Sequence, residues 1–137
     1  MILRFGKKSS GFGNKLVLAC VLVSGLLFTN MVQAKGPVPG DSLALITQGE
    51  LPPQGRDTYE KIQRGGPFSY EKDGVVFGNR ERILPPQKRG YYREYTVKTP
   101  GSRDRGARRI VCGGKPTAPD ACYYTADHYS SFRKIAP

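Results

Sequence analysis

The hydrophobic and polar positions divide the chain into one long apolar run near the N-terminus and a longer part with short alternating segments. Leu16–Phe28 contains 13 apolar or small residues and follows a region with basic but no acidic side chains. Val32-Gln33-Ala34 then brings small side chains to the positions that a signal peptidase reads. This order is typical of a signal peptide. We therefore predict a signal peptide over residues 1–34, with cleavage after Ala34.

Two other interpretations fit the same segment less well. A membrane anchor has to cross a hydrocarbon core of ~30 Å, whereas the 13 residues span about 20 Å as a helix. Leu18-Ala19-Cys20 resembles a lipobox, but cleavage there would leave the apolar stretch Val21–Phe28 on the mature protein. Export with cleavage after Ala34 is the simpler interpretation.

The remaining chain is predicted to have an N-terminal lead-in segment over residues 35–50, flexible over 35–42, and a domain over residues 51–137. Arg56–Arg64 is predicted as a helix with Tyr59 and Ile62 on one side, and Gly65-Gly66-Pro67 ends it. Six segments are predicted as strands from their apolar, aromatic and β-branched residues: Leu43–Ile46 at an edge, Gly74–Phe77, Tyr91–Val97, Arg108–Cys112, Cys122–Thr125 and Ser131–Ile135.

The connections between these strands determine the predicted fold class. They are too short to contain crossover helices, which favours an antiparallel sheet. The 17 Gly and 11 Pro residues also indicate many turns rather than a helical bundle. We predict an α+β domain with one α-helix packed on a twisted antiparallel β-sheet.

Charge and cysteine content narrow the function. Removing the signal peptide leaves 18 basic and 11 acidic side chains, which favours an anionic partner such as RNA or the cell envelope. It also leaves Cys112 and Cys122, and a disulfide is expected in an oxidising compartment. Closing a loop of 11 residues stabilises by about 3 kcal/mol. The spacing does not fit a CxxC-like redox site, and a single His excludes a conventional zinc site.

Three kinds of side chain are candidates for chemistry. Strand alternation puts Glu94 on one face with Tyr92 and Thr96, where a carboxylate is costly unless it is paired or functional. His128 is the one imidazole, and four guanidiniums that suit phosphate lie close together at Arg103, Arg105, Arg108 and Arg109. Taken singly, the arginines fit a solvated turn and His128 fits a structural role. Together they are suited to metal-free phosphodiester chemistry.

A purine site is a further candidate over Val75–Glu81. A base can stack on Phe77, backbone N–H groups can meet its acceptors, and Glu81 can accept from two N–H donors. Guanine presents that combination on one edge and adenine does not. The alternative is an ordinary turn closed by Asn79-Arg80-Glu81.

Five ordered motifs carry these groups: F-x-N-R-E at 77–81, L-P at 84–85, Y-R-E at 92–94, P-G-S-R-D-R-G-x-R-R-I at 100–110 and D-H-Y-x-x-F at 127–132. In this order the chain resembles the small secreted guanyl-specific ribonucleases of bacteria, the barnase family, and in particular their shorter one-helix branch. The resemblance covers Leu51 to Ile135 and implies the microbial ribonuclease fold.

The resemblance also implies a role for each group in RNA cleavage. Glu94 would be the general base and protonated His128 the general acid. Arg105 and Arg109 would stabilise charge on the phosphorus. The remaining residues would bind the substrate: Glu81 with the backbone of Asn79 and Arg80 reading guanine, Phe77 beneath the base and Tyr129 near the phosphate.

The implied partners and the departures from the family pattern complete this interpretation. The substrate would be RNA, without a metal or cofactor, and DNA is excluded because it lacks the 2′-OH nucleophile. A monomer and an acidic inhibitor of the barstar kind are also expected, and a role as a toxin against rival cells is possible.

Gly78 replaces a polar residue, and Cys112 and Cys122 flank an inserted hairpin, Gly113–Ala121, whose shape the sequence does not give. The competing hypothesis is a cationic RNA- or envelope-binding protein without turnover.

Overall fold

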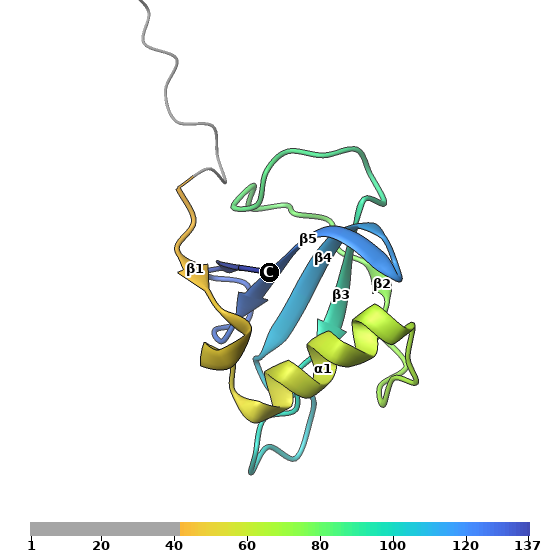
Figure 1. Cartoon of the computed structure of the whole chain (residues 1–137), viewed down its shortest axis with the longest axis vertical. Helices are drawn as coiled ribbons and strands as arrows, with labels where there is room; N and C mark the ends of the chain where they lie inside the picture. Colours follow the sequence, from red (N-terminus) through yellow and green to blue (C-terminus); the bar gives the residue numbers. More distant parts are fainter. Residues whose placement is uncertain (1–41) are drawn as a thin grey trace, which may run out of the picture. The chain divides into compact units, whose positions relative to one another are not determined.

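A computed structural model describes residues 42–137, so the predicted signal peptide and the start of the lead-in segment lie outside the described residues. The elements follow one another as β1 (Leu45–Ile46), a 3-10 helix (Gln48–Glu50), α1 (Pro53–Arg64), β2 (Val75–Val76), β3 (Tyr92–Thr96), β4 (Arg109–Lys115), β5 (Ala118–Thr125) and β6 (Arg133–Ile135). One helix on one sheet confirms the predicted α+β class (Figure 1).

The helix α1 begins three residues earlier than the sequence predicts. Pro53 extends the helix toward the N-terminus, because a proline suits the first turn, where its missing N–H has no partner in any case. Gly65 ends the helix in the left-handed conformation, with φ at 79°. The predicted inner side is confirmed, because Ile62 is fully buried and Tyr59 packs against the same core.

The sheet has six strands in the order β1-β6-β5-β4-β3-β2. Four of the neighbouring pairs are antiparallel, as predicted, but β1 pairs with β6 in parallel. The prediction of a wholly antiparallel sheet was wrong at this edge. It considered connections between consecutive strands, whereas β1 and β6 are the first and last strands and the whole domain connects them. Leu45 and Ile46, in the predicted lead-in segment, are thus part of the sheet.

The disulfide Cys112–Cys122 joins residues that face each other directly across β4 and β5. Both strands continue beyond it, to Lys115 and from Ala118, so the inserted segment is an extension of the hairpin. A register shift at Gly113 and Gly114 marks a bulge in this extension. The shape that the sequence left open is therefore a bulged two-stranded ribbon closed by a short turn.

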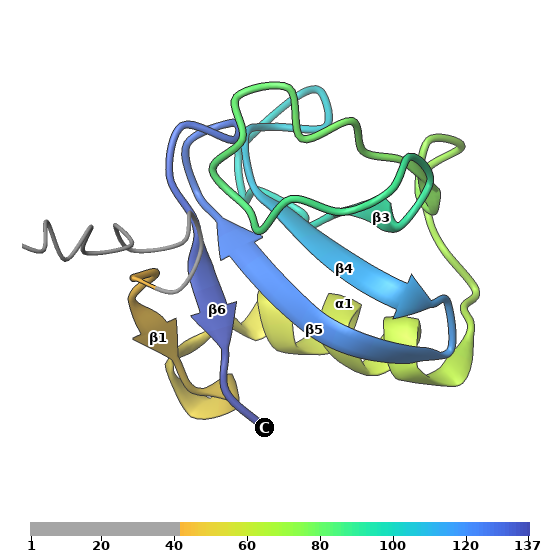
Figure 2. The same cartoon turned by 90° about the horizontal axis from the view of Figure 1, so that it is seen from above.

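The sheet buries side chains on both faces. One cluster, which includes Ile62, Tyr95 and Ile110, lies between α1 and the sheet. A second cluster on the other face contains Leu84, Tyr92, Val111, Tyr123 and Phe132. Figure 2 shows α1 on one side of the sheet and the long loops gathered on the other. The second cluster therefore packs between the sheet and these loops, on the face that carries Tyr92.

Candidate active site

Glu94 lies in the middle of β3, and its carboxylate contacts side chains from two different loops. The Tyr129 hydroxyl donates a hydrogen bond to Glu94 Oε2 over 2.7 Å. Arg105 Nη2 lies 3.4 Å from Oε1 of the same side chain. The Glu94 side chain is 14% exposed, so it is sheltered but open to a ligand. Three of the predicted site residues thus meet at one carboxylate.

Arg105 is held by the same strand that carries Glu94. Its Nε and Nη2 both donate to Thr96 Oγ1, over 3.0 and 2.7 Å. The loop that presents Arg105 is braced by Asp104, whose carboxylate accepts from the Ser102 hydroxyl and the Gly106 N–H. These hydrogen bonds, the Ser102 one foremost, hold the pKa of Asp104 below its usual value.

Arg109 is buried to 3% exposure at the start of β4. Its Nη1 donates to the carbonyls of Arg105, Gly106 and Arg108, at 3.3, 2.8 and 2.8 Å. Its Nε is buried and has no hydrogen-bond partner among residues 42–137. The guanidinium carbon lies 6.0 Å from the centre of the Tyr129 ring. One edge of this cation is thus fixed by backbone, while the group as a whole faces the loop that carries Tyr129.

Gly106 is required by the packing of the arginine loop. Its φ is 62°, in the left-handed region that favours glycine. A Cβ at this position would also collide with the side chain of Thr99. A larger residue would therefore move the carbonyl that Arg109 uses.

His128 is exposed in the loop after β5, and its ring centre lies 5.2 Å from that of Tyr129. Its backbone N–H donates to the Ala107 carbonyl over 3.1 Å, which ties this loop to the arginine loop. Asp127 stabilises the turn by accepting from the hydroxyls of Thr125 and Ser131 and from the Ser131 N–H. His128 is thus placed beside Tyr129 by two loops that hold each other.

Backbone strain is concentrated in the two loops that carry the predicted site residues. The non-glycine residues with positive φ in residues 42–137 are Asn79, Arg82, His128 and Tyr129. Such conformations cost about 1–3 kcal/mol each and persist where the surroundings enforce them. Conformations of this kind cluster in binding and catalytic segments.

A groove of about 840 Å³ begins at Glu94 and Tyr129 and runs over the loop after β2. Its wall contains the residues predicted to bind guanine: Phe77, Asn79, Arg80 and Glu81. Arg105, Arg109 and His128 do not line the groove but lie at its Glu94 end, through their contacts with Glu94 and Tyr129. The site thus has a roomy half and a cationic half that meet at Glu94.

The loop that forms the roomy half is closed by Asn79. Its side-chain amide donates to the Leu84 carbonyl over 2.9 Å, and its side-chain oxygen accepts from the Leu84 N–H over 3.1 Å. The Asn79 side chain is therefore occupied within the loop, and its carbonyl accepts from the Arg82 N–H over 3.0 Å, which leaves its backbone N–H for a ligand. Phe77 forms the floor, with ring centres 5.0 Å from Tyr129 and 6.0 Å from Phe132.

Tyr129 is a hydrogen-bond donor at every ordinary pH. Burial, the largest cause, and the neighbouring Glu94 carboxylate raise the pKa of the Tyr129 phenol to about 12. The Tyr129 phenol therefore keeps its proton through the neutral range and can donate it to Glu94 Oε2.

The chain is similar to known ribonucleases in sequence and structure. The family model described as ribonuclease matches residues 38–136. Guanyl-specific ribonuclease Sa of Kitasatospora aureofaciens is 56% identical over 95 residues, covering 69% of this chain and 96% of that protein. Guanyl-specific ribonuclease St of Saccharopolyspora erythraea is 57% identical over 88 residues, 64% of this chain and 83% of the relative. The match to guanyl-specific ribonuclease Sa3 of K. aureofaciens is 58% identical over 90 residues, 66% of this chain, and spans 62% of its length.

A solved structure of ribonuclease Sa2 with mononucleotides has the same fold. It is 48% identical, with a TM-score of 0.65, and the match covers 70% of this chain and 96% of that one. A second, of ribonuclease Sa2 with guanosine-2′-cyclophosphate, is 47% identical with a TM-score of 0.64, over 70% and 98% of the two chains. This chain belongs to the family of small guanyl-specific bacterial ribonucleases.

Two side chains of this ribonuclease support the site although the sequence analysis did not single them out. Thr96 orients Arg105, and its place on the Glu94 face was the signal that could have found it. Asp73 has a side chain only 4% exposed and lies 3.8 Å from Arg105 Nη2. It also accepts the Thr96 N–H over 2.7 Å. Because Asp73 precedes a glycine, it reads in the sequence as an ordinary turn residue.

Residues 42–137 of the ribonuclease contain no group of three or more His, Cys, Asp or Glu side chains arranged to hold a metal ion. Within the same residues, no helix has both the length and the apolar character needed to span a membrane.

Proposed function

We propose that this ribonuclease is a secreted enzyme that cleaves single-stranded RNA on the 3′ side of guanosine. The observation that supports this most is the meeting of Glu94, Arg105 and Tyr129 next to His128, at the end of a groove. A carboxylate within hydrogen-bond reach of a bound ribose can act as the general base for RNA cleavage.

In the first step Glu94 takes the proton of the ribose 2′-OH. The 2′-oxygen then forms a bond to phosphorus while the bond from phosphorus to the 5′-oxygen of the next nucleotide breaks. Protonated His128 donates its proton to that leaving oxygen. The products are a guanosine 2′,3′-cyclic phosphate and a free 5′-OH. The exposed position of the His128 ring suits contact with a leaving strand that continues into solvent.

In the second step a water molecule replaces the leaving nucleotide. His128 now takes a proton from the water, the new oxygen bonds to phosphorus, and the bond to the 2′-oxygen breaks. Glu94 returns its proton to the 2′-oxygen, which leaves a 3′-phosphate. Each group thus regains its starting protonation state.

Arg105 and Arg109 stabilise the charge that develops on the phosphoryl oxygens in both steps. Arg109 is suited to this because three carbonyls already fix one edge of its guanidinium, so little reorganisation is needed in the reaction. Arg105 is fixed in the same way by Thr96. Preorganised cations are worth more than mobile ones in such a site.

Guanine binds in the roomy half of the groove. Its ring lies against Phe77, backbone groups of Asn79 and Arg80 meet its acceptors, and Glu81 accepts from its two N–H donors. The clamp between Asn79 and Leu84 supports this, because it presents the loop backbone in one conformation. The same site offers adenine no matching partner for its amino group and N1 acceptor.

The test uses protein from the full-length gene and a short RNA that contains one guanosine, with EDTA present. Mass spectrometry identifies the ends of the fragments. We expect one cut, 3′ to the guanosine, with a 2′,3′-cyclic phosphate that is slowly converted to a 3′-phosphate. Cuts after every base would contradict the role of Glu81. Binding without any cut would favour the cationic binding protein instead.

The location and partners of the enzyme are part of the same proposal. Export with removal of residues 1–34 is supported by the disulfide, which needs an oxidising compartment. The mass of the purified protein tests cleavage after Ala34. The enzyme acts as a monomer, and its cationic cleft suits an acidic inhibitor of the barstar kind, since opposite charges speed association. Gel filtration, and titration of activity with an acidic candidate inhibitor, test these two points.

A further inference from the structure

The groove has a second rim that the proposed mechanism does not use. It is formed by Gln87–Gly90, the turn before β3, and it carries Lys88 and Arg89. Both side chains are exposed, and neither forms an ion pair with any residue between 42 and 137. Two free cations therefore line the same groove as Glu81 and Glu94.

This turn is held firmly although its charged side chains are free. The Tyr91 N–H donates to the Lys88 carbonyl over 3.1 Å and closes the turn. The Tyr92 hydroxyl donates to the Pro85 carbonyl over 2.8 Å, and the Tyr91 hydroxyl donates to Asp120 Oδ2 over 2.9 Å. The backbone under Lys88 and Arg89 is therefore fixed relative to the groove, which lowers the cost of ordering a ligand there.

The position of the turn along β3 indicates which part of an RNA strand it meets. Arg105 and Arg109 lie at the Thr96 end of the strand. Phe77 lies at the opposite end, where its N–H donates to the Tyr92 carbonyl over 2.9 Å. Lys88 and Arg89 precede Tyr92, so they lie beyond the base site and away from the reacting phosphate.

A strand bound at guanosine leaves the site in two directions. Its 3′ side passes the cationic end, where His128 protonates the leaving oxygen. The 5′ side is the part of the strand that remains for the other end of the groove. We propose that Lys88 and Arg89 bind the phosphodiester on the 5′ side of the guanosine. This inference rests on the proposed function and adds a substrate-binding subsite to it.

The chemistry of the pair suits a phosphodiester. A guanidinium contacts two phosphate oxygens at once, and an ammonium adds a mobile point charge. Binding also releases counterions from the RNA, so the contact weakens as salt rises. The subsite acts on substrate affinity rather than on the chemical step, because it lies away from the reacting phosphate.

The test compares three substrates: GpA, UpGpA with one additional phosphodiester on the 5′ side, and GpApU with one on the 3′ side. The enzyme is the full chain, purified in the form that accumulates after expression. We expect kcat/KM for UpGpA to exceed that for GpA by about tenfold at low salt, mainly through KM. Lys88→Gln with Arg89→Gln should remove this gain, leave GpA cleavage within about twofold, and preserve any gain on GpApU.

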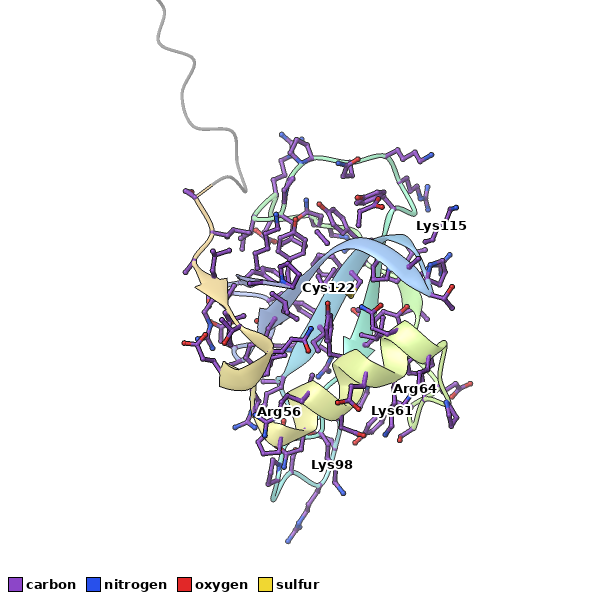
Figure 3. The ribbon with its side chains drawn as sticks, in the orientation of Figure 1. Arg56, Lys61, Arg64, Lys98, Lys115 and Cys122 are labelled. Atoms are coloured by element: carbon purple, nitrogen blue, oxygen red, sulfur yellow. A yellow bond between two sulfur atoms is a disulfide. The ribbon has the colours of Figure 1, made fainter. Side chains whose placement is uncertain are left out.

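The control is Lys61→Gln with Arg64→Gln, which likewise removes one lysine and one arginine charge. These two residues lie on α1, on the other face of the sheet (Figure 3). Both side chains are in surface ion pairs within the helix, so their loss should cost little stability. This variant should keep the full gain on UpGpA. Loss of the gain in the control would assign the effect to overall charge and overturn the inference.

Two further results would also overturn the inference while the proposed function stands. One is a wild-type enzyme that cleaves GpA and UpGpA equally well. The other is a gain on UpGpA that persists in the Lys88/Arg89 variant. If the wild type cleaves no substrate, the proposed function fails. The subsite is then judged by affinity for UpGpA with 2′-deoxyguanosine, and equal affinity of wild type and variant would overturn it.

Discussion

Tyr129 and Glu94 are joined by a 2.7 Å hydrogen bond from the phenol to the carboxylate, across 35 positions of the sequence. The bond links the loop after β5 to the middle of β3, so the loop that carries His128 and the strand that carries the carboxylate cannot move independently. It also makes one oxygen of Glu94 an acceptor while the other stays near Arg105.

Tyr129→Phe should therefore lower the rate of cleavage. The substitution removes the donor that holds Glu94 Oε2 and unties the loop of His128 from β3. We expect kcat to fall by about tenfold, the value of one hydrogen bond to a charged group. The measurement is kcat on GpA, with Tyr59→Phe on α1 as control. A kcat equal to that of the control would contradict the interpretation of this contact.

Glu94→Gln and His128→Gln should each lower kcat by about 10²–10⁴-fold, the usual contribution of a general acid or base. Wild-type enzyme should give a bell-shaped profile, because one group must be ionised and the other protonated. Glu60→Gln removes a carboxylate from the exposed side of α1 and should leave the rate unchanged. A near-normal rate in either active-site variant would show that its side chain does not transfer the proton.

Asp73→Asn should destabilise the protein more than a surface substitution does. Asp73 is almost fully buried, accepts the backbone N–H groups of Thr96 and Tyr70, and lies near Arg105. We expect a loss of about 2–3 kcal/mol in the free energy of unfolding, because hydrogen bonds to a charged group are lost. Urea denaturation measures this, and Asp57→Asn on the surface of α1 is the matched control. Equal losses in the two variants would count against a structural role for Asp73.

Reduction of Cys112–Cys122 should lower the free energy of unfolding by about 3 kcal/mol, which is the loop-closure value for a short loop. The two cysteines are also buried, at 5% and 3% exposure, so a double serine variant should lose more than the reduced wild type. Urea denaturation with and without a reducing agent makes the comparison. Identical curves would mean that the bridge does not constrain the unfolded chain.

The loop of Asp127 should make stability depend on pH in the acid range. Hydrogen bonds, first from the Ser131 hydroxyl, lower the pKa of Asp127 from its ordinary 3.8 to about 2. A lowered pKa stabilises the fold above the ordinary value, and the contribution is lost as pH falls toward 2. Asp127→Asn should therefore show a smaller fall in its urea midpoint between pH 4 and pH 2 than wild type. A fall of equal size in both proteins would contradict this.

The sequence predicted most of the fold because the signals involved are local. The helix has apolar residues at helical spacing and a glycine at its end, and the strands alternate or are rich in β-branched residues. The parallel pair of β1 and β6 was not predicted, since it joins the two ends of the domain and leaves no local signal. The extent of the β4–β5 hairpin was also missed, because Gly113 and Gly114 look like a turn but form a bulge within it.

The site was predicted where residue chemistry is unusual and missed where it is ordinary. A carboxylate in the middle of a strand, a cluster of arginines and a single histidine are uncommon, which drew attention to Glu94, the arginines and His128. The family motifs then implied a role for each of them. Asp73 and Thr96 are common residues in common places, and their importance comes from a contact with Arg105 that depends on the folded structure. The role of the Asn79 side chain in closing its own loop likewise depends on where the fold places Leu84.

The pairing of β1 with β6 has a consequence for folding during synthesis. Among the described strands β1 is made first and β6 last, and β6 separates β1 from the rest of the sheet. A nascent chain that already carries every predicted site residue, through Tyr129, therefore still lacks the strand that joins β1 to the sheet.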